Sequence, residues 1–451
     1  MTQDLAADDT RQPSPVSFWQ ALSFWLKLGF ISFGGPAGQI AIMHEELVIR
    51  RRWISDKRFL HALNYCMVLP GPEAQQLATY IGWLMHKTLG GIVAGVLFVL
   101  PSFFILVALS WIYIAFGQVP LVEGFFYGIK PAVTAIVLQA AHRIGSRVLK
   151  NNVLWAVAAA SFLAIFALNV PFPFIVFVAA AIGFFGGRLA PESFKSLGGR
   201  GKTDKSFGLA LIDDQTPTPE HAVFKWRKLV QVALVGAALW AIPMGLLAIN
   251  YGWDHTLTQM SWFFTKAALL TFGGAYAVLP YVYQGAVDQF GWLTATQMID
   301  GLALGETTPG PLIMVVAFVG FIGGYVKALL GPESLFWAGA VAATLVTWFT
   351  FLPSFIFILA GGPFIESTHN DLKFTAPLTA ITAAVVGVIL NLALFFGYHV
   401  LWPLGFSGLF DWLSATIAAA SALMLFKFKA NVIYVIALSG VAGVFVKWFL
   451  T

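Results

Sequence analysis

Charged residues and cysteine are both scarce in this chain of 451 residues. Lysine, arginine, aspartate and glutamate together make up 10% of it, against roughly 25% in soluble domains. Hydrophobic residues make up 59%, and a soluble globule of this size has too little interior to bury so many. The single cysteine, Cys66, excludes an intramolecular disulfide and a cysteine-based metal or iron–sulfur centre. These scarcities exclude a soluble enzyme and indicate an all-α polytopic membrane protein.

Long uncharged runs predict where the chain crosses the bilayer, whose hydrocarbon core requires about 20 apolar residues per helix. The run 151–187 has no charged residue, and Pro171-Phe172-Pro173 divides it into two spans. The other predicted spans lie near 89–116, 124–142, 229–249, 334–359, 374–398, 411–427 and 431–449. Glycine and proline clusters interrupt four further segments, near 18–43, 59–85, 259–283 and 297–325.

The distribution of lysine and arginine decides whether these four segments cross or turn back. Basic residues gather at 50–58, 143–150 and in the linker 188–228. They fall on one side, as the positive-inside bias requires, only if the interrupted segments enter the membrane and return. We therefore predict nine crossing helices and four re-entrant hairpins, and the alternative is thirteen simple spans. The predicted organisation is a cytoplasmic tail (1–17), an N-terminal membrane repeat (18–187), a flexible, solvated cytoplasmic linker (188–228), and a C-terminal membrane repeat (229–451) with one extra helix (229–249).

An internal repeat is the strongest feature of the sequence. Positions 27–72 match positions 266–311 at a constant offset of 239 residues (266 − 27). The extra helix before the second copy predicts that it is inverted relative to the first. Inverted repeats with broken helices are typical of secondary transporters, whose substrate binds at the repeat interface. The matching motifs are Phe33-Gly34-Gly35 with Phe272-Gly273-Gly274, Pro70-Gly71-Pro72 with Pro309-Gly310-Pro311, and Leu100-Pro101-Ser102 with Leu352-Pro353-Ser354.

The broken helices predict an anion site. A helix that restarts after a break presents unpaired N–H groups and the positive end of its dipole. Lys27 and Lys266 lie six residues before each Phe-Gly-Gly motif and are candidate cations, with Lys130 a weaker one; the alternative is that these lysines extend to the membrane interface. Candidate polar partners beside the breaks are Ser32, Thr271, Thr307 and Thr308, which would otherwise cap the half-helices, and Gln39, Gln75 and Gln76.

Carboxylates next to the breaks are candidates for proton coupling, because an ionisable residue inside a membrane is costly and functional by default. Glu73 follows Pro72, and Glu306 precedes Thr307, although the two are not repeat mates. Asp300 and His61 occupy equivalent positions in the two repeats and are weaker candidates. A charge facing water at a hairpin tip is the alternative for each.

In combination, these motifs resemble the chromate ion transporter family, and the resemblance covers nearly the whole chain. It implies two oppositely oriented halves in the inner (plasma) membrane, and the positive-inside bias places the N-terminus in the cytoplasm. It also implies proton-driven export of chromate, which confers chromate resistance. A sulfate or other oxyanion carrier and a passive anion channel are the alternatives. No flavin, haem or cysteine pattern favours an enzyme, and no catalytic residue, metal or cofactor is expected.

The predicted partners are a chromate or sulfate oxyanion, the lipid bilayer and a second copy of the chain in a homodimer, with no nucleic acid. The predicted mechanism is alternating access by rocking of one inverted half against the other. The predicted substrate site consists of Lys27, Ser32, Phe33, Gly34, Gly35, Pro70, Gly71, Pro72, Lys266, Thr271, Phe272, Gly273, Gly274, Thr307, Thr308, Pro309, Gly310 and Pro311.

Overall fold

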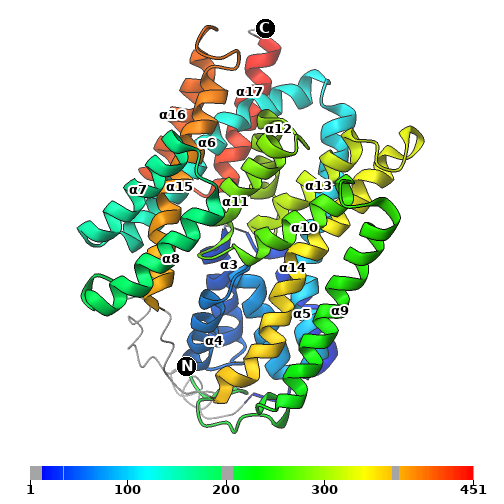
Figure 1. Cartoon of the computed structure of the whole chain (residues 1–451), viewed down its shortest axis with the longest axis vertical. Helices are drawn as coiled ribbons and strands as arrows, with labels where there is room; N and C mark the ends of the chain where they lie inside the picture. Colours follow the sequence, from blue (N-terminus) through cyan, green and yellow to red (C-terminus); the bar gives the residue numbers. More distant parts are fainter. Residues whose placement is uncertain (1–12, 34, 195–206, 368–374, 450–451) are drawn as a thin grey trace, which may run out of the picture.

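A computed structural model describes residues 13–33, 35–194, 207–367 and 375–449. Within these ranges the chain is almost entirely helical, and its β-structure is limited to an isolated bridge between Ile54 and Ile212. Figure 1 shows the helices as a bundle elongated along one axis. The predicted all-α class is confirmed.

Short helices open the first repeat and long ones complete it. Pro72 and Pro171, which cannot sit inside a helix without cost, immediately precede two of the long helices, α5 and α8. The helices are α2 (Phe18–Ile31), α3 (Gly35–His44) with its π-helical continuation η1 (Glu45–Arg50), α4 (Asp56–Val68), α5 (Glu73–Phe116), α6 (Pro120–Val148), α7 (Asn152–Leu168) and α8 (Phe172–Leu189).

Helix α5 reverses direction near its start. His86 and Lys87 have non-helical backbone angles, and Lys87 has a positive φ of 56°. The two arms then run antiparallel, since Gly82 lies against Gly90 and Ala94 on the returning arm. Residues 73–85 are therefore a half-helix, and residues 88–116 are a separate spanning helix.

Both broken segments of the first repeat begin and end at one face of the molecule. The ring of His86 bonds the carbonyl of Val16, just before α2, at 3.0 Å. The linker meets the ends of both hairpins. Its residues 211–221 bond the carbonyl of Trp53, the guanidinium of Arg58 and the carbonyl of Trp83. The first two interrupted segments are therefore re-entrant, as predicted.

The second repeat follows the extra helix α9 (Trp226–Tyr251) and has the same plan. The outer ends of its two hairpins meet at Gly323. This residue contacts Met260, and a Cβ added to it would lie 3.2 Å from the Cβ of Trp292. These segments therefore also enter and return. The helices are α10 (Thr256–Leu269), α11 (Ala275–Tyr283) with π-helical η5 (Gln284–Gln289), α12 (Ala295–Thr307), η6 (Leu312–Met314), α13 (Val315–Val326), α14 (Leu335–Ser367), α15 (Thr375–Leu401), α16 (Trp412–Phe426) and α17 (Val432–Phe449).

The two repeats have opposite orientations. The rings of Trp111, near the far end of α5, and Phe336, at the start of α14, are 6.1 Å apart. Helix α13 runs antiparallel to α14, with Gly324 against Ala338. The hairpins of the second repeat therefore open to the face opposite the linker, and the repeats are inverted.

The repeats interlock and do not form separate halves. Helices α6, α7 and α8 of the first repeat pack on α15, α16 and α17 of the second, and we call this the bundle group. The hairpins of both repeats pack together around the 88–116 arm, α9 and α14, and we call this the loop group (Figure 1). Each repeat contributes to both groups.

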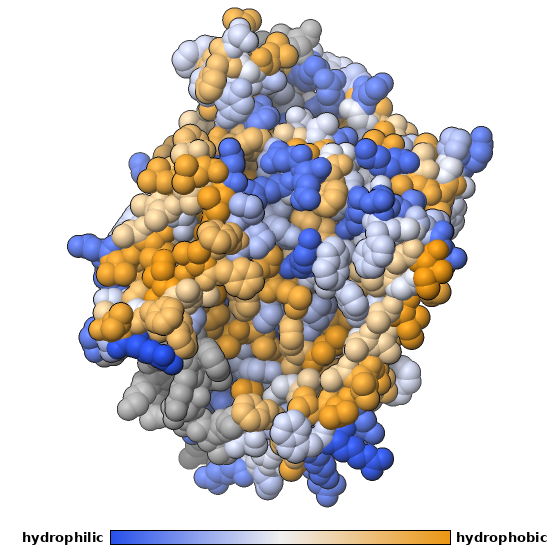
Figure 2. Space-filling view, viewed as in Figure 1, coloured by the Kyte–Doolittle hydropathy of each residue, from blue (hydrophilic) through white to orange (hydrophobic). Residues whose placement is uncertain are grey.

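The outer flanks of the molecule are apolar. Among the described residues, seven helices are long and apolar enough to cross a membrane, and α7 and α16 are shorter apolar helices of 17 and 15 residues. Figure 2 shows hydrophobic side chains over the flanks formed by α8 and α9, where Phe177, Phe185, Leu234 and Ile249 are exposed. This surface suits lipid, and the chain is a multi-pass membrane protein.

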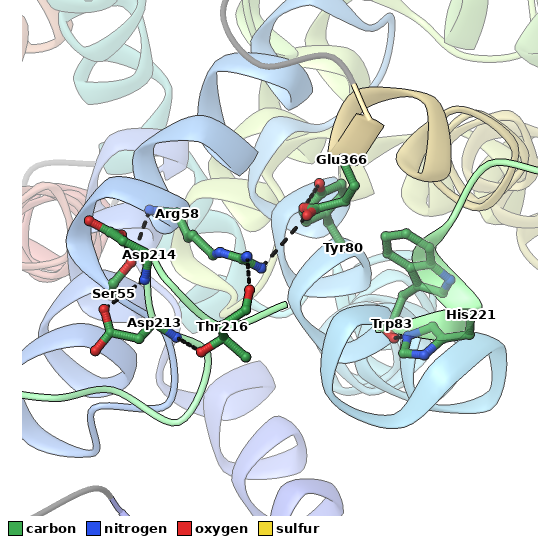
Figure 3. Close-up of polar contacts among 9 residues, drawn as sticks. All are labelled: Ser55, Arg58, Tyr80, Trp83, Asp213, Asp214, Thr216, His221 and Glu366. Atoms are coloured by element: carbon green, nitrogen blue, oxygen red, sulfur yellow. Dashed lines mark hydrogen bonds and ion pairs between the residues drawn. The ribbon is translucent and has the colours of Figure 1, made fainter. Parts of the chain in front are cut away.

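Part of the linker docks on the first repeat. Ile212 and Ala222 are buried, so the expectation of a solvated tether is wrong for residues 207–222, whereas 195–206 lie outside the described residues. Besides backbone bonds to Arg52, Trp53 and Ser55, side-chain bonds hold this segment, as Figure 3 shows: Ser55 Oγ to Asp214 Oδ1 (2.5 Å), Arg58 Nη2 to the carbonyl of Thr216 (2.6 Å), and His221 Nε2 to the carbonyl of Trp83 (2.9 Å).

Beside the linker, a buried polar cluster joins the two repeats. Glu366 near the end of α14 accepts a hydrogen bond of 2.5 Å from the hydroxyl of Tyr80 and lies 3.7 Å from Arg58 Nη1 (Figure 3). Breaking such a pair leaves a buried charge without compensation, which is strongly destabilising. The cluster therefore fastens the α4–α5 hairpin to the second repeat.

Candidate functional site

The loops that interrupt the hairpins meet between the repeats and bond each other crosswise. The N–H of Gly71 donates to the carbonyl of Thr271 at 2.7 Å, and the N–H of Gly310 donates to the carbonyl of Ser32, also at 2.7 Å. Both pairs are related by the offset of 239 residues, so the two bonds are copies of one contact. The Pro-Gly-Pro loop of each repeat is thus fastened to the Phe-Gly-Gly break of the other.

These loops require glycine because of their conformation and because of close neighbours. Gly71 and Gly310 have φ angles of 129° and 99°, which side chains rarely allow. A Cβ on Gly310 would lie 2.8 Å from the Cβ of Ser102, and one on Gly71 would collide with the hydroxyl of Ser354. Ser102 and Ser354 belong to the repeated Leu-Pro-Ser motifs. The spanning arm of each repeat therefore supports the loop of the other.

Glutamines complete the support of the loops. Gln39 Nε2 donates to the carbonyl of Gly310 at 2.5 Å, and Gln76 Nε2 donates to the carbonyl of Pro70 at 2.8 Å. Gln75 Nε2 donates to the hydroxyl of Thr79 at 3.1 Å. All three glutamines are buried at the breaks, where they bind the protein's own backbone and side chains.

The half-helices that restart after the breaks have no side-chain cap at three of their starts. Helix α5 starts after Pro72, α11 after Gly274 and η6 after Pro311, and none of these residues makes a side-chain cap hydrogen bond. The first N–H groups of such helices have no intrahelical partner. With the dipoles of the half-helices, these N–H groups place partial positive charge at the breaks.

Several buried polar atoms around the loops have no hydrogen-bond partner. They are the hydroxyls of Ser32 and Ser102 and the side-chain oxygens of Gln75 and Gln76. Leaving a buried polar group unpaired costs about 1–3 kcal/mol. Two unpaired hydroxyl donors next to uncapped helix starts are suited to a ligand with several acceptor oxygens.

The predicted threonine donors are already engaged. The hydroxyls of Thr271, Thr307 and Thr308 donate to the carbonyls of Ala267, Leu304 and Gly305, at 2.7, 2.8 and 3.0 Å. They close the last turns of the helices before the breaks, so the capping alternative describes them better than ligand binding. Ser32 remains as the hydroxyl donor of this set.

A basic residue that the sequence analysis used only for topology lies at the site. A guanidinium nitrogen of Arg143 on α6 is 4.0 Å from where a Cβ on Gly35 would be, at the start of α3. Arg143 also neighbours Glu306, whose carboxylate accepts a hydrogen bond from the hydroxyl of Tyr276. An arginine beside a helix start is a strong recognition element for an oxyanion. Its position near the end of a helix with Arg147 had suggested only a cytoplasmic flank.

The structure does not bring the two predicted lysines to the loops. Lys27 is exposed on a face of α2 that also carries the exposed Trp19 and Phe30. Lys266 is half-buried on α10, with its ammonium 5.7 Å from the ring centre of the exposed Trp262. Both therefore lie on outward apolar faces, where a lysine extends its charged end toward the interface.

The remaining predicted residues shape the breaks. Phe33 and Phe272 are half-buried, and Pro309 and Pro311 are buried beside Gly310. Gly35, Gly273 and Gly274 have φ angles of 69°, 75° and 99°, which explains the paired glycines. Gly34 lies outside the described residues. Glu73, half-buried, forms the first turn of α5, where the helix dipole favours its charge.

Comparisons with known proteins find similar chains among transport proteins. The chain is 35% identical over 448 residues to a chromate transport protein of Pseudomonas aeruginosa, which covers 97% of this chain and 95% of the relative. It is 28% identical over 428 residues to a chromate transport protein of Cupriavidus metallidurans, covering 94% and 92%. A probable chromate transport protein of Synechococcus elongatus is 28% identical over 430 residues, covering 95% of each chain.

No solved structure matches the chain. The family described as chromate transporter matches residues 19–184 and 258–444, which are the two repeats without the linker and the extra helix. With this match over most of the chain and the relatives of nearly equal length, the chain belongs to the chromate transporter family.

Proposed function

We propose that this protein exports chromate, as a doubly charged oxyanion, across the inner (plasma) membrane in exchange for protons. The observation that carries the proposal is the meeting of four broken helices at the repeat interface. Two buried hydroxyls without partners lie there, beside uncapped helix starts. A dianion loses much hydration on leaving water, and backbone N–H groups, Ser32, Ser102 and Arg143 replace it.

The proposed orientation has the linker and the N-terminus in the cytoplasm. The linker face collects Arg50, Arg51, Arg147 and Lys150, whereas the opposite face carries Asp254, Asp288, Glu333 and Asp411, with Lys327 and Lys447 as basic exceptions. This asymmetry follows the positive-inside bias.

A cavity of about 750 Å³ supports a path to the opposite face. It is lined by Pro280 on α11 and by Asp288, Asn169 and Trp402 near the ends of neighbouring elements. Helix α11 starts at the crossed loops and ends at this cavity. One short helix therefore connects the proposed anion site to the outer face.

Because the repeats interlock, the proposed motion is not the rocking of one repeat against the other. Rigid rocking of one repeat against the other would break the crossed bonds of Gly71 and Gly310 and the packing of α6 on α15 and α17. The bundle group can move relative to the loop group with those contacts intact. We therefore propose alternating access by displacement of the bundle group, which carries Arg143 toward and away from the start of α3.

Uptake of labelled chromate into everted membrane vesicles tests the proposed function. The assay compares vesicles with and without an imposed pH gradient, and with and without equimolar sulfate. Gradient-dependent uptake that resists sulfate supports proton-coupled chromate export. Uptake abolished by sulfate would assign a sulfate carrier, and uptake that ignores the pH gradient would assign a passive channel. Vesicles containing the Gly310→Ala variant serve as the matched background.

A further inference from the structure

A second charged cluster lies in the membrane-embedded part of the chain, apart from the crossed loops. Asp300 on α12 is 1% exposed. Its Oδ2 accepts a hydrogen bond of 2.9 Å from the hydroxyl of Tyr113 and lies 3.5 Å from the ammonium of Lys130. Its Oδ1 is buried and has no hydrogen-bond partner. We propose that Asp300, with Lys130 and Tyr113, is the site that binds the coupling proton, and this inference rests on the proposed function.

A purely structural role accounts poorly for this cluster. A buried ion pair is often no more stabilising than well-packed apolar residues, because both charges lose their hydration. Here the cost is higher, since one carboxylate oxygen is left without a donor. The unpartnered Oδ1 is the atom to which a proton can add while Oδ2 keeps its bond to Tyr113.

The cluster lies on the boundary between the two moving groups. Lys130 belongs to α6 of the bundle group, whereas Asp300 belongs to α12 and Tyr113 to the spanning arm of α5, both in the loop group. The other elements packed on α12 are α13, α15, α17 and the uncharged η6. Of their charged side chains, Lys447 on α17 pairs with Glu123 at 2.9 Å. Lys130 is therefore the charged partner of Asp300 across the boundary.

The cluster also lies on the outer side of the anion site. Lys130 and Arg143 are 13 residues apart on α6, a separation of about 20 Å along a helix. Arg143 lies beside the crossed loops toward the linker face, and Lys130 lies toward the opposite face. Asp300 is therefore closer to the outer face than the anion site is.

Proton binding at Asp300 weakens the contact between the bundle group and the loop group. A proton from water adds to Oδ1, and the carboxylate becomes a neutral acid. The ion pair with Lys130 is then lost, because Asp300 no longer carries a charge. The attraction between α6 and α12 is then lost, which frees the bundle group to move. Release of the proton to the cytoplasmic side restores the carboxylate and the pair. This sequence couples proton entry to the displacement without contact between proton and oxyanion.

The test uses the full-length protein in liposomes with labelled chromate, and it separates net transport from exchange. Asp300→Asn keeps the site neutral, so we expect at least a tenfold loss of pH-driven transport while chromate–chromate exchange without a gradient is retained. Glu123→Gln, which breaks the exposed pair with Lys447 on the same face of α6, is the matched control and is expected to keep both activities.

The outcomes separate the inference from the proposed function. If wild-type protein moves no chromate in either mode, the proposed function fails. If Asp300→Asn retains pH-driven transport, or loses exchange together with it, the inference is overturned. Should Asp300→Asn not reach the membrane, Tyr113→Phe decides instead. Loss of that hydroxyl donor favours the protonated acid, so the pH midpoint of transport is expected to rise, and an unchanged pH profile overturns the inference.

Discussion

Replacing Gly310 with alanine tests the crossed loops directly. The new Cβ would lie 2.8 Å from the Cβ of Ser102. That atom is bonded directly to the backbone, so it cannot move away unless the backbone shifts. Overpacking of this kind costs about 1–3 kcal/mol. The φ of 99° adds about 1–3 kcal/mol, because an alanine rarely adopts it. At 1.4 kcal/mol per tenfold, a total of about 2–6 kcal/mol lowers the population of the native loop by roughly 30-fold or more.

Two measurements follow from this cost. Thermal unfolding of the purified protein in detergent can be monitored by size-exclusion chromatography. The midpoint temperature of unfolding is expected to be lower for Gly310→Ala. Chromate transport in liposomes is expected to fall at least tenfold, because the loop no longer holds its bond to the carbonyl of Ser32. Adding Ser102→Gly removes the atom that collides, so it is expected to restore part of the stability but not the transport.

The matched control is Gly245→Ala on α9, where no atom lies within 4 Å of the added Cβ. This change is expected to leave transport unchanged and to stabilise the helix slightly. The reasoning is refuted if Gly310→Ala behaves like Gly245→Ala in both assays. It is also refuted if Ser102→Gly recovers none of the lost stability, since the Cβ of Ser102 would then not be the cause of the loss.

The remaining predictions concern the site, the outward lysine of α2 and the docked linker. Ser32→Ala removes an unpartnered hydroxyl, and since a hydrogen bond to a charge is worth about 1.5–3 kcal/mol, the KM for chromate is expected to rise at least tenfold. Arg143→Gln is expected to abolish measurable uptake while Arg147→Gln, at an exposed position on the same helix, retains it; equal loss in both variants would contradict a specific role. Lys27→Met, on the outward face, is expected to transport normally, and a strong loss would restore the lysine hypothesis. Burial lowers the pKa of His221 below its usual value, so docking of the linker is expected to be complete above about pH 6.5 and to weaken as the pH falls through the lowered pKa, measured as faster proteolysis of the linker.

The spans and the re-entrant hairpins were predictable because their causes are local. Glycine and proline interrupt a helix wherever they occur, and the bias of arginine and lysine toward one side reports on topology. The offset of 239 residues revealed the repeat, and the extra helix before the second copy predicted that the copy is inverted. The crossed bonds follow from that symmetry, but their partners emerge only when two segments far apart in the sequence are packed together.

The charged residues of the site were harder to predict. In a soluble protein an apolar helix face points to the core, but in a membrane protein it points equally well to lipid. The spacing of Lys27 from its glycines therefore did not reveal which way it faces. Arg143 carried a topological signal that concealed its position beside the crossed loops. Asp300 was recognised as an intramembrane carboxylate, whereas its partner Lys130 lies on a helix 170 positions away (300 − 130).

The crosswise fastening of the loops has a consequence for how such a chain can be built. Neither repeat contains both members of its own contact, since Gly71 bonds the carbonyl of Thr271 and Gly310 bonds that of Ser32. A polypeptide carrying a single repeat would leave its Pro-Gly-Pro N–H and its Phe-Gly-Gly carbonyl unpaired at membrane depth. It could satisfy them only by assembling with a copy inserted in the opposite direction. Fusion through a reorienting helix places the two orientations in one gene product at a fixed ratio of one to one.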